Sequence, residues 1–66
     1  MEYQIESIKS VINSTKKRIN EFKEGIEKNL ANRNFTEVNL LKQQIAGLES
    51  FKLGLEYALK LITEEI

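Results

Sequence analysis

Apolar residues recur every three or four positions through the first half of the chain. The members of this first seam are Ile5, Ile8, Ile12, Thr15, Ile19, Phe22 and Ile26, of which only Thr15 is polar. Steps that alternate between three and four are the a and d spacing of a heptad repeat, which keeps one face of a helix turned toward a neighbouring helix. The pattern predicts one long amphipathic helix from about residue 2 to about residue 30.

The second half of the chain carries an equally regular heptad pattern. The members of this second seam are Val38, Leu41, Ile45, Leu48, Lys52, Leu55, Leu59, Ile62 and Ile66, of which only Lys52 is polar. This spacing predicts a second helix from about residue 36 to about residue 65.

A short turn is predicted between the helices, over residues 31–35. Three asparagines gather around it, namely Asn29, Asn32 and Asn34. Asparagine tolerates the left-handed conformation at helix ends and is a good cap for a following helix. Two starts for the second helix remain open: Asn34 has the capping-box spacing to Glu37, whereas a Thr36 cap would let Phe35 pack on Leu40.

A turn this short makes the two helices antiparallel neighbours. The fold class is therefore all-α, a coiled-coil-like antiparallel two-helix hairpin that forms a single domain over residues 1–66. Facing the two seams pairs Ile26 with Leu41 beside the turn and places Thr15 opposite Lys52, so the two polar exceptions share one layer. The same register predicts two ion pairs beside the seam, Lys9 with Glu56 and Lys16 with Glu49.

The second helix has another apolar stripe, turned about 100° from the second seam. This second apolar face consists of Leu40, Gly47, Ser50, Phe51, Gly54, Ala58 and Leu61. A glycine inside a helix costs about 0.5 to 1 kcal/mol relative to alanine and often marks a place where another backbone approaches closely. The face therefore predicts an oligomer interface, which would complete a four-helix bundle or a larger assembly, with a dimer as the first choice.

The layout resembles the Rop-type homodimers of helical hairpins, and residues 35–62 resemble short hairpins of phage proteins that inhibit host enzymes or sequester nucleotide signals. Richness in Ile, Asn, Lys and Glu is also typical of phages and bacteria with AT-rich genomes. These resemblances imply a small regulator, inhibitor or assembly factor of phage or prophage origin, which acts on a host or phage protein. No residue role is carried over from them.

Composition limits the kinds of site and partner that this chain can have. The 66 residues include no Cys and no His, so thiol nucleophiles, imidazole bases and the usual zinc sites are excluded, and we expect no enzyme activity, catalytic residue, metal or cofactor. Ten basic and ten acidic residues balance, which disfavours nucleic-acid binding. No apolar run is long enough to span a membrane, and with no disulfide framework or leader pattern we expect the cytoplasm.

Three interpretations of the basic residues stay open. The layer of Thr15 and Lys52 fixes register and partner number, as single polar core positions do elsewhere. Alternatively, Lys52, Arg18 or Arg33 binds a small anionic ligand, such as a nucleotide, between protomers. Association with nucleic acid is a third alternative.

Overall fold

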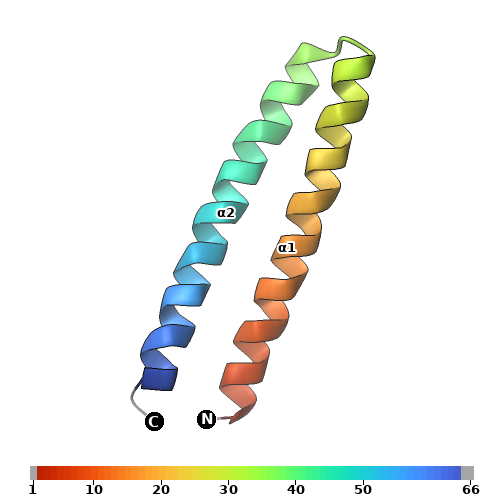
Figure 1. Cartoon of the computed structure of the whole chain (residues 1–66). Helices are drawn as coiled ribbons and strands as arrows, with labels where there is room; N and C mark the ends of the chain where they lie inside the picture. Colours follow the sequence, from red (N-terminus) through yellow and green to blue (C-terminus); the bar gives the residue numbers. More distant parts are fainter. Residues whose placement is uncertain (1, 65–66) are drawn as a thin grey trace.

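Two helices of equal length make up the computed structural model, which describes residues 2–64. Helix α1 spans Glu2–Ala31 and helix α2 spans Phe35–Glu64, and they lie side by side in antiparallel directions (Figure 1). The rod measures 50 × 15 × 11 Å, and its radius of gyration of 15.2 Å exceeds the value of about 11 Å expected for a compact chain of this length. The predicted all-α antiparallel hairpin is confirmed, while Ile66 of the second seam lies outside the described residues.

The turn joins the helices through residues 32–34 and satisfies the last carbonyl groups of α1. The amide of Asn34 donates to the carbonyl oxygen of Asn29 and the amide of Arg33 to that of Leu30, which is the Schellman pattern of a helix C-terminus. Arg33 takes the left-handed conformation this pattern requires, with φ of 57°. Arg33, and none of the three asparagines near the turn, occupies this position, because the place in the turn and not the residue type sets the conformation.

Asn34 also starts the second helix. Its side-chain Oδ1 accepts a hydrogen bond from the amide of Glu37 at 3.5 Å, and its Nδ2 donates to Oδ1 of Asn29 at 3.3 Å. The Asn34 start is confirmed, and the alternative start at Thr36 is wrong, since α2 already begins at Phe35. One residue therefore closes α1 and caps α2, which explains how so short a link reverses the chain.

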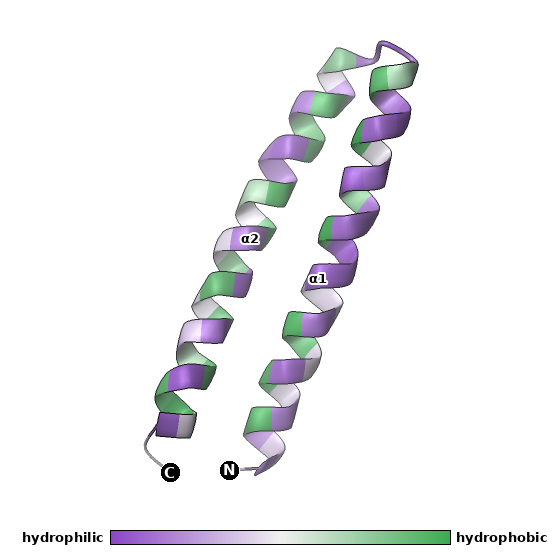
Figure 2. Ribbon diagram, viewed as in Figure 1, coloured by the Kyte–Doolittle hydropathy of each residue, from purple (hydrophilic) through white to green (hydrophobic). Residues whose placement is uncertain are grey.

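The core follows the two seams. Its buried members are Ile12, Thr15, Ile19, Val38 and Ile45, and every other described seam residue is half-buried. In Figure 2 the hydrophobic colour follows the side of α1 that faces α2, and the hydrophilic colour covers its outer side. No large side chain in residues 2–64 is fully buried, because a pair of helices covers each seam from one side only.

Contacts along the seam agree with the predicted register. A Cβ added to Gly25 would lie 3.3 Å from Cδ1 of Leu41, which places these two residues together beside the turn. Farther along the rod, Ile12 and Leu59 line the same groove. Thr15 is buried and Lys52 half-buried, but the Thr15 hydroxyl donates to the carbonyl oxygen of Val11 at 2.7 Å instead of bonding to Lys52.

Candidate interaction surface

The second apolar face is left uncovered by the hairpin. Its large side chains Leu40, Phe51 and Leu61 expose 49%, 53% and 45% of their surface. Of its small residues, Ala58 is half-buried and the others are exposed. The face runs along α2 beside the seam, because heptad spacing keeps its members in line over the whole helix. About half of the surface of each large side chain is thus available to a partner.

The two glycines of this face have nothing to accommodate within the chain. A Cβ added to Gly47 or to Gly54 would meet no atom within 4 Å. Their lack of a side chain therefore has no explanation in the packing of α1 against α2. Gly25 is the glycine that the hairpin itself uses, since α2 approaches it through Leu41. Sequence reasoning missed this role, although Gly25 directly precedes Ile26 of the first seam.

Helix α1 adds one apolar residue that sequence reasoning also missed. Val11 is 42% exposed and directly precedes the buried Ile12, just as Ala58 directly precedes Leu59. Both therefore occupy the g position of a heptad repeat, and g positions lie on the same flank of two antiparallel helices. The flank that carries Phe51 and Ala58 of the second apolar face consequently continues onto α1.

The candidate anion-binding residues are distributed along the rod. Arg18 lines a shallow depression of about 310 Å³ together with Phe22, Gln44, Gly47 and Leu48, so it lies at the edge of the second apolar face. Lys52 lies half-buried in the seam. Arg33 lies in the turn, and the stretch of α2 from Phe35 to Lys52 alone spans about 25 Å. One hairpin therefore does not bring Arg33 to Lys52.

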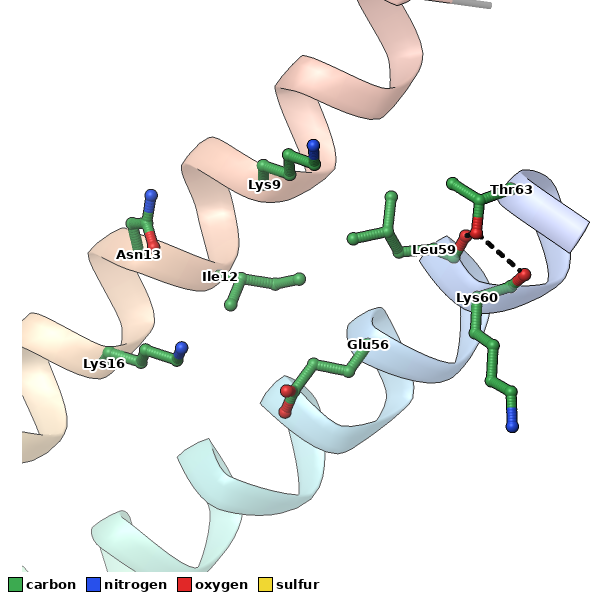
Figure 3. A pocket seen from close by; sticks show the side chains of 8 residues that line it. All are labelled: Lys9, Ile12, Asn13, Lys16, Glu56, Leu59, Lys60 and Thr63. Carbon is green, nitrogen blue, oxygen red and sulfur yellow. Dashed lines mark hydrogen bonds between the residues drawn. The ribbon is translucent and has the colours of Figure 1, made fainter.

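The opposite flank of the seam is charged and hollowed. A groove of about 500 Å³ runs between the helices near their free ends (Figure 3). It is lined by Lys9, Ile12, Asn13, Lys16, Glu56, Leu59, Lys60 and Thr63. The Thr63 hydroxyl donates to the carbonyl oxygens of Leu59 at 3.0 Å and Lys60 at 3.1 Å, so it is engaged by its own helix.

The predicted ion pairs across this groove do not form. Within residues 2–64, the only acid and base within 4 Å of each other are Glu64 and Lys60, at 3.9 Å along α2. Lys9 and Lys16 reach into the groove from α1, and Glu56 lies on the other wall without contacting them (Figure 3). Solvated charges on long side chains gain only about 0 to 1 kcal/mol by pairing, which is too little to hold them together.

The described residues contain no cluster of three or more metal-ligating side chains, and neither helix is long and apolar enough to cross a membrane. Comparison of the chain with protein-family models, with curated proteins and with solved structures finds no match. The hairpin has one charged flank, one flank with exposed apolar side chains, and a core that the two helices cover incompletely.

Proposed function

We propose that this chain is a non-enzymatic helical interaction protein, which acts as a homo-oligomer through the second apolar face. The observation that carries the proposal is the line of half-exposed Leu40, Phe51 and Leu61, with open space at the two glycines between them. Exposed apolar residues gathered in one continuous stripe mark interaction sites on soluble proteins. The assembled hairpins would then act on a protein partner, as a regulator, an inhibitor or an assembly factor.

The area of the molecule supports a partner of the size of one hairpin. The accessible surface is 5186 Å², whereas a compact monomer of 7.7 kDa is expected to expose about 4,300 Å². The excess of about 900 Å² is close to the 800 Å² or so that each partner buries in a standard protein interface. One dimer contact would therefore bring the exposed area per chain to that of an ordinary compact domain.

The small core also favours association with a second chain. Within residues 2–64, only Ile12, Ile19, Val38 and Ile45 are buried apolar residues, and a chain of this size is near the lower limit at which one core stabilises a fold. The chain has no Cys for disulfides, and residues 2–64 hold no metal-ligand cluster. Association is the remaining means by which small domains add buried apolar area.

Molecular mass in solution tests this proposal. Sedimentation equilibrium at micromolar concentration should give at least twice the 7.7 kDa chain mass. Gly54→Leu should lower the mass while the helical circular dichroism signal persists, because the new side chain projects into open space in the hairpin but into the partner in the assembly. Asn20→Leu adds the same side chain to the exposed surface of α1 and should leave the mass unchanged. A well-folded wild-type monomer at this concentration contradicts the proposal.

A second candidate function is the binding of a small anionic ligand, such as a nucleotide, between protomers. It is favoured by the placement of Arg18 in a depression that includes Gly47 of the second apolar face. A bound ligand raises the melting temperature by mass action, so thermal shift against a nucleotide panel tests it. The shift should be lost in Arg18→Gln, and the absence of any shift at about 1 mM nucleotide would exclude useful affinity.

A further inference from the structure

Four of the seven residues of the second apolar face follow the same order of large and small side chains in both directions along α2. Leucine, glycine, glycine and leucine stand at successive heptad intervals, as Leu40, Gly47, Gly54 and Leu61. The midpoint of this series falls between Ser50 and Phe51. A surface with this order is complementary to a reversed copy of itself, since leucines meet leucines and glycines meet glycines.

We infer that a second copy of this chain covers the second apolar face, with the two α2 helices antiparallel about a two-fold axis between Ser50 and Phe51. This inference rests on the proposed function and specifies its geometry. A two-fold interface is reciprocal, so Leu40 packs against the partner's Leu61 and Gly47 against the partner's Gly54. The missing Cβ atoms let the two backbones approach closely around the axis.

Charge distribution favours the antiparallel over the parallel arrangement. Residues 2–9 and 56–64, at the free end of the rod, contain four acidic and two basic residues, namely Glu2, Glu6, Glu56 and Glu64 with Lys9 and Lys60. Residues 23–42, at the turn end, contain four basic and three acidic residues, namely Lys23, Lys28, Arg33 and Lys42 with Glu24, Glu27 and Glu37. Antiparallel packing brings each turn end beside the partner's acidic free end, and it also opposes the two helix dipoles.

The same axis determines where the α1 helices lie. A two-fold axis perpendicular to both α2 helices keeps the two α1 helices on one side of the α2 pair. The second apolar face lies about 100° around α2 from the seam, which is close to the right angle at each corner of a four-helix bundle. Val11 then lies on the inner flank of the bundle, where its exposed surface becomes covered.

Disulfide cross-linking tests this register, and the absence of native Cys makes every cross-link traceable. Positions 40 and 61 lie about 31 Å apart along one α2 helix, far beyond the reach of about 7 Å between Cα atoms in a disulfide. Leu40→Cys alone and Leu61→Cys alone should therefore give no covalent dimer on oxidation. An equimolar mixture of the two, after subunit exchange, should give one.

A matched pair on another face controls for random collision. Asn39→Cys and Lys60→Cys lie at nearly the same levels, about 100° around the helix, and their mixture should not cross-link. Isotope-filtered NMR on the wild-type protein gives a second measurement, because contacts between the methyl groups of Leu40 and Leu61 can arise only between chains. Cross-linking of either leucine variant alone, or a dimer without these methyl contacts, overturns the antiparallel register but leaves the proposed oligomer standing. A monomeric wild-type mass removes both.

Discussion

Replacing Gly54 with alanine should stabilise the isolated hairpin and weaken its association. In the hairpin the added Cβ meets no atom within 4 Å, so nothing opposes the better helix propensity of alanine. The expected gain in the free energy of unfolding is about 0.5 to 1 kcal/mol, which raises the melting temperature of a domain this small by about 2 to 8 °C. This gain should be measured at concentrations low enough for the monomer to dominate.

In the assembly the same methyl group enters the space that the partner's backbone occupies. Overpacking of a close contact costs about 1 to 3 kcal/mol, so the dissociation constant should rise about 5- to 150-fold for each overpacked contact in the dimer. Sedimentation equilibrium over a concentration series measures this constant. Over the same series, the melting temperatures of the variant and the wild type should change order. At low concentration the variant melts above the wild type, and at high concentration it melts below.

Two glycine controls sharpen the experiment. Gly47→Ala should behave like Gly54→Ala, because its added Cβ also meets open space in the hairpin. Gly25→Ala has the same propensity gain, but its Cβ lies 3.3 Å from the flexible end of Leu41 inside the hairpin, so its packing effect is already present at concentrations at which the monomer dominates. If Gly54→Ala raises the melting temperature at every concentration and leaves the dissociation constant unchanged, nothing packs on Gly54, and the role given to the second apolar face is refuted.

Three further substitutions and one exposed control, Leu53→Ala, test the hairpin itself, each by urea denaturation followed by circular dichroism. Arg33→Gly should raise the free energy of unfolding by about 0.5 to 1 kcal/mol, because glycine adopts the φ of 57° without steric cost; a loss would show that the Arg33 side chain contributes to the turn. Asn34→Ala should lower it by about 0.5 to 2 kcal/mol through loss of the α2 cap, and no change would mean that the 3.5 Å bond to Glu37 contributes nothing. Ile19→Ala should lower the free energy of unfolding by about 2 to 5 kcal/mol, enough to unfold much of the chain. Leu53→Ala, at a position that is 64% exposed, should lower it by less than about 1 kcal/mol. Equal effects of these two substitutions would place the core elsewhere.

The sequence by itself determined the two helices, the turn and the faces that meet. Heptad spacing is a local geometric property, so residues such as Ile12 and Ile45 could be assigned to the seam without knowledge of the partner helix. The capping-box spacing of Asn34 and Glu37 is equally local, which is why the start of α2 could be anticipated to within two alternatives. The second apolar face also came from periodicity, and the structure adds that its large side chains are half exposed.

Only the tertiary structure decided where the two helices touch and where they leave space. Gly25 proved to be the glycine approached by the opposite helix, a fact that depends on the axial offset of α1 against α2 and not on either helix pattern alone. Arg33 took the left-handed position because of its place in the chain reversal. The charged flank remained unpaired, since sequence spacing can bring Lys9 and Glu56 to the same groove, but the small gain of a solvated ion pair does not hold their side chains together.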